Sequence, residues 1–405
     1  MAYIIEPRVL KGFRDFLPAA EIERRSLTEG IEASFRSYGF VPIDTPAMEY
    51  AEILLGKSGG ETEKQIYRFQ DKGGRDLALR FDLTVPFARF CAEHYGELTL
   101  PFKRYHIAKV WRGENTQRGR YREFTQCDCD IVGSDAAAAD FEILLVMQTT
   151  LKTIAGNGGI SIRLNHRGLF NRFLTRLDCG GRSVEILHSV DKLAKAGREA
   201  TEQSLTELAG GEKAAAILAY IETGSAGFEE TLARITEAAG GPCPESERLA
   251  LIRRFMHDTG TADSFVLDPS ITRGLDYYTG LVFETFLNDL PGIGSVCSGG
   301  RYDNLAGLYT RERLPGVGSS IGLDRLIAAQ EALGQTRARQ SYARAAIACL
   351  REEDGGCYQA LAARFRNRGI PINVMTEPKK LLQQFIQAEK QGASWVIIPG
   401  EKPLE

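Results

Sequence analysis

The fold is decided by two strand-like runs in the first third of the chain, YHIAKVWRGE (residues 105–114) and REFTQCDCDIVG (residues 122–133). A polar turn that contains Gly119 joins them, so we expect a long antiparallel hairpin. Side chains alternate between the two faces of a strand. The polar positions that share a face are therefore Arg112 and Glu114 in the first run, and Gln126, Asp128 and Asp130 in the second.

This hairpin concentrates arginine. Four guanidinium groups fall within eleven residues, at Arg112, Arg118, Arg120 and Arg122. Arginine donates two parallel hydrogen bonds to phosphate oxygens, so the cluster suits a triphosphate. Taken separately, the arginines could belong to a solvated hairpin loop, and Asp128 and Asp130 could form a polar outer face. Burying so many charges would be costly without ligands to pair them. The CDCD quartet at 127–130 has no second ligand cluster, so we predict no metal site from side-chain spacing.

Two glycine-bounded stretches in the second half of the chain point to a binding surface. Residues 273–280, RGLDYYTG, place a cation, a carboxylate and two phenols just before a strand at 281–287. Residues 316–322, GVGSSIG, form a strand that leads into a helix ending near Gly334 and places Arg325 at the edge of the sheet. On spacing alone, SGGRYDNL at 298–305 is just a turn, although its glycines would let the backbone approach a ligand closely.

The regions before and after the hairpin have their own patterns. A helix is expected over 19–38 and a strand over 40–45, and a strand at 77–81 delivers Asp82, Leu83 and Thr84, which alone could simply start a helix. Residues 176–260 are Ala-, Leu- and Glu-rich and predict a helical insertion, either a structural cap or a functional part. A linker at 335–344 precedes a β-α-β-α-β pattern, which predicts a small parallel α/β lobe.

Composition sets the remaining bounds. The chain has 405 residues, of which 43% are hydrophobic and 25% charged, so two or three soluble domains are expected. A net charge of −3 means that a polyanion must meet local basic patches. The eight cysteines form no C-x-x-C pair, which indicates a reducing cytoplasm. We expect neither export nor a membrane span, because the start lacks a signal pattern and no apolar run reaches about 18 residues.

Taken in order, these motifs resemble those of the histidyl-tRNA synthetases, a family of class II aminoacyl-tRNA synthetases. The resemblance implies an α+β fold, with a class II catalytic domain on a mainly antiparallel sheet, a helical insertion and a C-terminal α/β lobe. The stretches that carry it are KGFRD at 11–15, the helix and strand before Pro46 (motif 1), 111–126 (motif 2), 273–280 and 298–305 (histidine motifs), and 316–325 (motif 3). The implied domains are 1–175 and 261–334 (catalytic), 176–260 (insertion), 335–344 (linker) and 345–405 (an anticodon-binding-like lobe that looks incomplete).

The resemblance also implies a reaction and its residues. L-Histidine would be activated with ATP and Mg²⁺ to histidyl adenylate and pyrophosphate, and histidine would then pass to the 3′ end of tRNA(His). Histidine binding would fall to Asp82, Leu83, Thr84, Arg112, Gln126, Asp130, Arg273, Tyr277 and Tyr278. ATP binding would fall to Arg112, Glu114, Arg120, Phe124 and Arg325. The implied catalytic residues are Arg273 and Arg112.

The resemblance further implies a homodimer formed through the motif 1 region. A rival interpretation is a non-catalytic, histidine-sensing regulatory subunit of ATP phosphoribosyltransferase, which resembles the catalytic domain. The short C-terminal lobe favours this rival. The complete arginine set and the complete stretch at 273–280 oppose it, because a sensor needs a histidine pocket without a triphosphate clamp.

Overall fold

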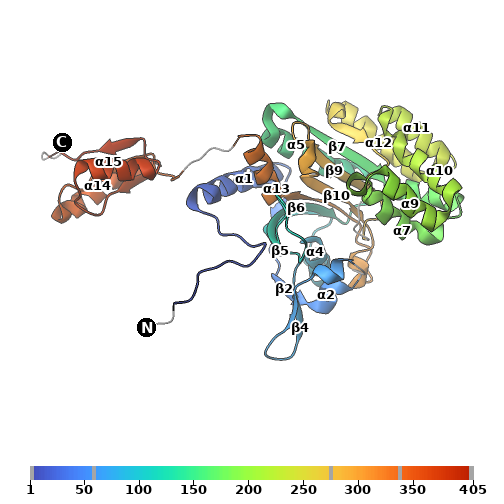
Figure 1. Cartoon of the computed structure of the whole chain (residues 1–405), viewed down its shortest axis with the longest axis horizontal. Helices are drawn as coiled ribbons and strands as arrows, with labels where there is room; N and C mark the ends of the chain where they lie inside the picture. The colour runs from blue at the N-terminus through green and yellow to red at the C-terminus, as the bar shows by residue number, and fades with distance from the viewer. Residues whose placement is uncertain (1–3, 57–60, 273–276, 336–339, 401–405) are drawn as a thin grey trace. The chain divides into compact units, whose positions relative to one another are not determined.

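The computed structural model describes residues 4–56, 61–272, 277–335 and 340–400 (Figure 1). The chain divides into two compact units. The larger comprises residues 1–13 and 28–334, and the smaller comprises residues 14–27 and 335–405. No helix within the described ranges is both long and apolar enough to cross a membrane.

The larger unit is built on an eight-stranded sheet in the order β1-β5-β6-β11-β10-β9-β7-β8. Its strands are β1 (Val41–Pro42), β5 (Phe102–Trp111), β6 (Glu123–Val132), β7 (Ile160–His166), β8 (Phe265–Leu267), β9 (Leu281–Leu287), β10 (Cys297–Tyr302) and β11 (Gly316–Gly322). Pairing is antiparallel from β5 to β7, whereas β1 and β8 pair in parallel at the two ends. The predicted α+β fold on a mainly antiparallel sheet is confirmed.

The predicted hairpin is formed by β5 and β6, which pair over their whole lengths with Arg104 opposite Asp130. The first strand ends earlier than predicted, at Trp111. The amide of Arg112 still donates to the carbonyl of Arg122 across the hairpin (2.9 Å), but that of Gly113 donates to the carbonyl of Gln65 (2.7 Å), so the backbone leaves the ladder after Arg112. Arg112 and Glu114, which we expected on one face of this strand, therefore lie beyond its end.

Helices flank this sheet. Helix α5 (Ala137–Ala155) packs against β6, β7, β10 and β11, and its buried residues include Ile143, Leu144 and Met147. The other flanking helices are the second half of α1 (Pro18–Ser37), from Thr28 onward, together with α4 (Thr84–Glu93) and α13 (Leu323–Ala332). A second, three-stranded sheet contains β2 (Met48–Tyr50), β3 (Arg68–Gln70) and β4 (Asp76–Leu79), with α2 (Ala51–Leu55) and α3 (Glu61–Gln65) beside it in sequence.

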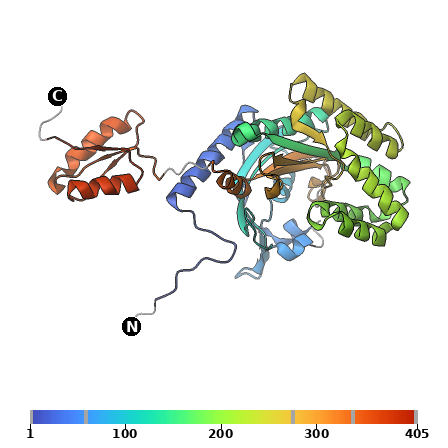
Figure 2. The ribbon, with the colours of Figure 1, turned by 45° about the horizontal axis from the view of Figure 1, so that its top comes forward.

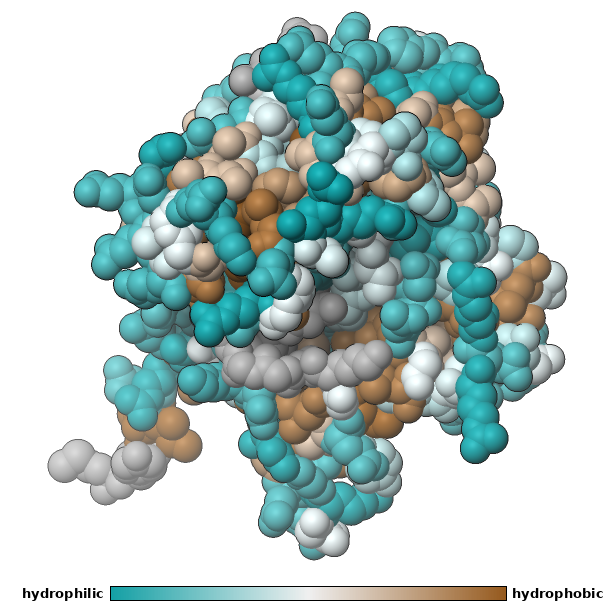
Figure 3. All heavy atoms as spheres, turned by 90° about the vertical axis from the view of Figure 1, so that its right-hand side faces the viewer, coloured by the Kyte–Doolittle hydropathy of each residue, from teal (hydrophilic) through white to brown (hydrophobic). Residues whose placement is uncertain are grey.

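A helical region follows β7 directly, nine residues before its predicted start at 176. Its helices are α6 (Arg167–Arg176), α7 (Ser183–Asp191), α8 (Leu193–Ala196), α9 (Arg198–Ala209), α10 (Gly211–Ile221), α11 (Phe228–Ala238) and α12 (Pro244–Asp258). They gather beside the β7 end of the sheet (Figure 2). Stacked rings of Phe173 and Tyr220, 4.3 Å apart, lie in their core. The face of the molecule seen in Figure 3 is mostly hydrophilic and is hollowed near its centre.

The smaller unit has the predicted β-α-β-α-β pattern. Its strands β12 (Ala345–Ile347), β13 (Ile372–Val374) and β14 (Trp395–Ile397) are parallel, in the order β13-β12-β14. Helices α14 (Gly355–Arg366) and α15 (Leu381–Lys390) connect them. The core of this unit includes Ile347, Tyr358 and Val374.

Candidate active site

A cavity of about 1160 Å³ in the larger unit lies over β6, β11, β10 and β9. It collects most of the residues implied by the resemblance. Those on its wall are Asp82, Thr84, Arg112, Glu114, Arg120, Phe124, Gln126, Asp130, Tyr277, Tyr278 and Arg325. Leu83 is fully buried and does not line the cavity. Arg273 lies outside the described residues. The roles of these side chains remain predictions, but residues separated by more than 200 positions now share one wall.

One end of the cavity is built on a buried ion pair. Arg104, which is completely buried, lies 2.7 Å from Oδ2 of Asp130 through its Nη2. The Tyr302 hydroxyl donates to Oδ1 of the same carboxylate (2.5 Å). The guanidinium of Arg104 also lies 4.1 Å from the centre of the Phe87 ring. Asp130 is thereby fixed from two sides. The alternative of an outward polar face is wrong, because Asp128 and Asp130 are 1% and 2% exposed.

Burial controls the ionisation of the carboxyl groups here. It raises the pKa of Asp82 to about 6, against the opposing effects of the Val85 amide and the Arg112 charge. It raises the pKa of Asp128 to about 7, against the attraction of Arg104. The pKa of Asp130 is also raised by burial, although Arg104 and Tyr302 act in the other direction. A cationic ligand would stabilise the ionised carboxylates, so this end favours a positively charged group.

Glycines make room for these side chains. A Cβ atom on Gly318 would lie 1.8 Å from Oδ1 of Asp130, and one on Gly316 would lie 2.4 Å from the Tyr302 ring. A Cβ atom on Gly300 would lie 2.7 Å from the Tyr278 ring. Pocket side chains therefore cross the neighbouring strands at positions where only glycine fits without a shift. This is the physical reason for the glycine-rich sequences of β10 and β11.

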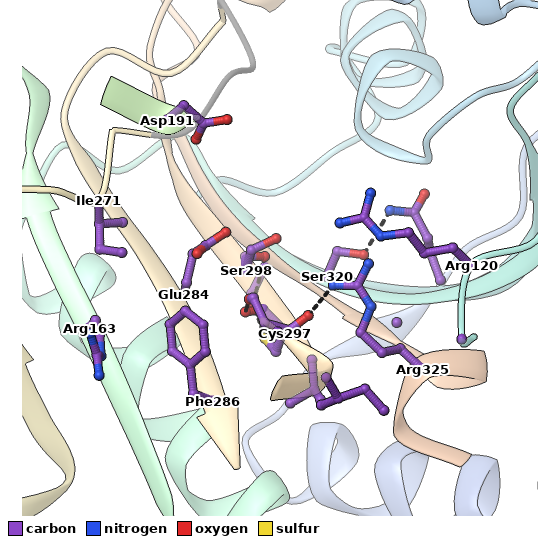
Figure 4. Close-up of a pocket in the computed structure, with 18 of the residues that line it drawn as sticks. Arg120, Arg163, Asp191, Ile271, Glu284, Phe286, Cys297, Ser298, Ser320 and Arg325 are labelled. Carbon is purple, nitrogen blue, oxygen red and sulfur yellow. Dashed lines mark hydrogen bonds between the residues drawn. The ribbon is translucent and has the colours of Figure 1, made fainter. Parts of the chain in front are cut away.

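Guanidinium groups line a second part of the cavity. Arg112 donates from Nε to the carbonyl of Phe81 (2.8 Å), and its guanidinium lies 5.2 Å from the centre of the Phe124 ring. Arg325, in the first turn of α13, donates to the carbonyl of Ser295. Arg120 lies 3.5 Å from Glu114. Figure 4 shows Arg120 and Arg325 on the same side of the pocket.

The helix that carries Arg325 is locked to the hairpin. The amide of Thr125 in β6 donates to Oδ2 of Asp324 (2.7 Å). Gly119 in the hairpin turn has a left-handed φ of +72°, and a Cβ atom there would lie 3.2 Å from Cα of Arg325. The turn therefore packs closely on α13, and this contact brings Arg120 and Arg325 together. The sequence predicted both arginines but not this contact.

Sequence reasoning missed residues that support the cavity wall or form part of it. Arg104 and Tyr302 were not singled out, although the register places Arg104 directly opposite Asp130. The available signal for Arg104 was the pairing of β5, which carries lysine and arginine, with β6, which carries carboxylates. Ser320 was also missed; its hydroxyl accepts a hydrogen bond from Nε2 of Gln126 (2.9 Å).

An antiparallel sheet that carries a carboxylate pocket beside an arginine cluster, with a glycine-rich strand leading into an arginine-bearing helix, defines a class II aminoacyl-tRNA synthetase catalytic domain. The histidyl-tRNA synthetase family model matches residues 12–326. With this match over more than half of its length, the chain belongs to the histidyl-tRNA synthetase family.

Known relatives agree with this assignment. The histidine–tRNA ligase of Treponema denticola is 55% identical over 400 residues, which cover 98% of this chain and 89% of the relative. That of Rhodopirellula baltica is 48% identical over 408 residues, which cover 99% and 92%. The crystal structure of histidyl-tRNA synthetase from Nostoc sp. PCC 7120 is similar with a TM-score of 0.81 at 30% identity, covering 96% of this chain and 90% of that one.

Proposed function

We propose that this chain is a histidine–tRNA ligase, which activates L-histidine with ATP and transfers the histidyl group to the 3′ end of tRNA(His). The observation that supports this most strongly is the shared wall of the cavity. It combines an anionic pocket around Asp130 with the guanidinium groups of Arg112, Arg120 and Arg325. A cationic amino acid and a polyphosphate need these two environments side by side.

The histidine end offers buried acceptor atoms to hydrogen-bond donors of a ligand. Within the described part of the chain, Oδ2 of Asp82 and Oε1 of Gln126 are buried and accept no hydrogen bond. A buried acceptor left unpaired costs about 1–3 kcal/mol, so a ligand that donates to it is favoured. The α-ammonium group suits Asp82, and an imidazole N–H suits Gln126 and Asp130. Tyr277 and Tyr278, with ring centres 4.8 Å apart, would enclose the ligand.

At the ATP end, arginine side chains would stabilise the negative charge that develops during activation. A carboxylate oxygen of histidine attacks the α-phosphorus, and the bond to the pyrophosphate oxygen breaks. Negative charge develops on the phosphoryl oxygens, which fixed guanidinium groups stabilise without reorganisation. We assign this role to Arg112 and, from sequence alone, to Arg273. Phe124 would pack against the adenine, while Arg120 and Arg325 would bind the outer phosphates.

Mg²⁺ would bind at this site together with ATP, through the phosphates of the substrate. The described residues contain no group of three or more side chains that could hold a metal ion by themselves. Mg²⁺ commonly binds through substrate phosphates, water and one or two carboxylates. Glu114, on the cavity wall beside Arg120, is the carboxylate suited to this task. Bound there, the ion would neutralise charge on the leaving pyrophosphate.

The rival role as a histidine-sensing regulatory subunit is not favoured. A Bacillus halodurans protein described as an ATP phosphoribosyltransferase regulatory subunit/histidyl-tRNA synthetase has a TM-score of 0.79, but at 20% identity it shares the fold alone. The arginine cluster lies on the cavity wall, as a catalyst requires. Attachment of radiolabelled histidine to tRNA(His) separates the two roles. A ligase forms histidyl-tRNA, whereas a sensor binds histidine and forms none.

We also propose a homodimer that acts in the cytoplasm. Exposed apolar side chains lie on the short strands that follow α1 in the chain, Val41 of β1 within the motif 1 region and Met48 and Tyr50 of β2 just after it. Such residues are suited to an interface, because apolar surface left in water is unfavourable. Sedimentation equilibrium of the protein and of Met48→Glu would test this: the wild-type protein should be dimeric and the variant more dissociated, while a monomeric wild-type protein would refute it.

A further inference from the structure

The cavity extends beyond the residues assigned to histidine and ATP. Its far end is walled by Arg163 of β7, by Glu284 and Phe286 of β9, and by Asp268 after β8. Figure 4 shows Arg163, Glu284 and Phe286 together, across the pocket from Arg120 and Arg325. The last residue of α7, Asp191, belongs to the same wall. This far end therefore lies against the helical region.

The strand register fixes how far this end lies from Ser320, the hydrogen-bond partner of Gln126 in the proposed histidine pocket. Ser320 of β11 pairs with Ser298 of β10, Ser298 pairs with Glu284, and Glu284 pairs with Arg163. These residues form one row across the cavity floor. Three strand spacings separate its ends, or about 14 Å. Phe286 shares the face of Glu284, because it lies two residues further along the same strand.

Side chains at the far end form an ordered planar surface. The guanidinium of Arg163 lies 5.2 Å from the centre of the Phe286 ring, and its Nη1 donates to Oδ2 of Asp268 (3.3 Å). Oδ1 of Asp268 in turn accepts hydrogen bonds from the Ser270 amide (3.0 Å) and hydroxyl (2.6 Å). The Arg163 side chain is nevertheless 49% exposed, so a ligand can reach its flat face.

This chemistry matches a nucleoside. Aromatic and guanidinium planes stack on single unpaired bases, and carboxylates accept hydrogen bonds from ribose hydroxyls and exocyclic amines. The carboxylates of Asp268, Glu284 and Asp191 disfavour a phosphate at the same place. The cavity thus holds two aromatic–arginine pairs, Phe124 with Arg112 and Phe286 with Arg163. The proposed reaction likewise has two substrates that carry a base, ATP and the terminal residue of the RNA.

We propose that Arg163, Asp268, Glu284 and Phe286 form a subsite for the 3′-terminal nucleoside of the RNA acceptor, an inference that rests on the proposed function. From this subsite, a ribose hydroxyl oxygen attacks the carbonyl carbon of histidyl adenylate and forms an ester bond. The bond from that carbon to the phosphate oxygen breaks, AMP leaves with the electron pair, and the hydroxyl proton passes to the departing phosphate.

The helical region also contacts this end of the cavity. The hydroxyl of Thr272 donates to the carbonyl of Leu187 in α7 (3.1 Å), which joins the segment after β8 to the helices. Val190 and Leu193 continue the wall beyond Asp191. An RNA end that enters here would pass along α7 and α8 before it reaches the subsite. The subsite thereby gives the helical region a role in the second step of the reaction.

The test compares the two steps of the reaction, histidine activation and transfer to tRNA, in the variant Phe286→Leu. Leucine keeps an apolar side chain at this position but has no flat ring. We expect histidine-dependent ATP–pyrophosphate exchange to stay within about twofold of the wild-type protein, because the residues that position histidine and ATP are unchanged. Single-turnover transfer from preformed histidyl adenylate to tRNA(His) should fall roughly 5- to 150-fold, which is the value of one base–aromatic stack. Phe286→Tyr keeps the ring and should transfer normally.

Arg163→Gln gives the same readout at a half-exposed position, where folding is not at risk. It should slow transfer and spare exchange. Unchanged transfer in Phe286→Leu and Arg163→Gln would refute the subsite. A parallel fall in exchange would also refute it, since the residues would then serve ATP or histidine. Failure of the proposed function itself is distinct, because the wild-type protein would then show no exchange.

Discussion

Asp130→Asn isolates the charge at the centre of the histidine pocket. The substitution keeps the size of the side chain and its position against Tyr302, but it removes the negative charge that faces Arg104 at 2.7 Å. Hydrogen bonds to a charged group contribute about 1.5–3 kcal/mol, or roughly 10- to 150-fold in affinity. We therefore expect the KM for histidine to rise by that factor while the KM for ATP changes little.

Stability changes in the same variant and must be measured beside the kinetics. Removing one partner of a buried ion pair costs about 3–5 kcal/mol. We expect the lower end of that range, because Asp128 also attracts Arg104. Exchange rates should therefore be taken at a temperature where circular dichroism shows the variant folded. A histidine titration at saturating ATP and an ATP titration at saturating histidine then give the two KM values.

Asp128→Asn is the matched control. Asp128 lies on the same face of β6 and is equally buried, but it does not line the cavity. Burial raises the pKa of its carboxyl group to about 7, so the folded protein favours the neutral form, which asparagine resembles. We expect a near-normal KM for histidine. Equal rises in both KM values for Asp130→Asn, or an equal effect of Asp128→Asn, would refute the assignment of Asp130 to the histidine pocket.

Four further outcomes are expected. Gly318→Ala should raise the KM for histidine, because the new methyl group would lie 1.8 Å from Oδ1 of Asp130; Gly307→Ala, where a Cβ meets open space, should not. Urea titrations of the ligand-free wild-type protein and of Asp128→Asn should show that the difference in stability between them falls, at the expense of the wild type, as the pH rises from 5 to 8, since the raised pKa of Asp128 (about 7) makes the folded wild-type chain hold a proton that the unfolded chain has lost, whereas the lowered pKa values of His106 and His166 (about 4) act equally in both proteins; a difference that does not change with pH would contradict this. Asp140→Ala should lower the free energy of unfolding by about 3–5 kcal/mol, because it leaves Arg301 and Arg248 without their shared buried carboxylate, whereas Glu202→Ala at an exposed pair should change little. Arg273→Ala should lower kcat for exchange by about 10²- to 10³-fold and Arg273→Lys should recover part of it; a loss confined to histidine affinity would instead make Arg273 a binding residue.

The sequence predicted the main antiparallel sheet because its patterns are local. The alternation around Asp128 and the glycine-bounded strand at 281–287 are each readable within about ten residues. The βαβαβ order of the C-terminal lobe was equally readable, because apolar strands alternate there with amphipathic helices. These predictions need only the period of the side chains.

The parts that the sequence could not give depend on contacts between distant elements. The end of β5 at Trp111 is set by the hydrogen bond from Gly113 to Gln65, nearly fifty positions away. The burial of Arg104 follows from the packing of β5 between neighbours in the sheet and against Phe87. The early start of the helical region at Arg167 is another case, since no composition change marks it.

The candidate site likewise has residues that the sequence could identify and contacts that it could not. Chemistry-bearing residues such as Asp82, Gln126 and Arg325 could be singled out by type and by motif, and the structure places them on one wall. The contacts of their supporting partners could not be predicted. Tyr302 and Ser320 lie within the quoted motifs, but the motifs do not say which side chains they meet, and Ser295 acts through its backbone carbonyl. The far end of the cavity was missed for the same reason: Arg163, Asp268 and Phe286 come from three strands or their ends.

The central claim is that the cavity activates histidine. Its most direct test is ATP–pyrophosphate exchange by the purified chain in the presence of each amino acid in turn. The account predicts exchange that depends on L-histidine and falls to background with the other amino acids. Histidine binding without any exchange would contradict it and would make the chain a sensor rather than a ligase.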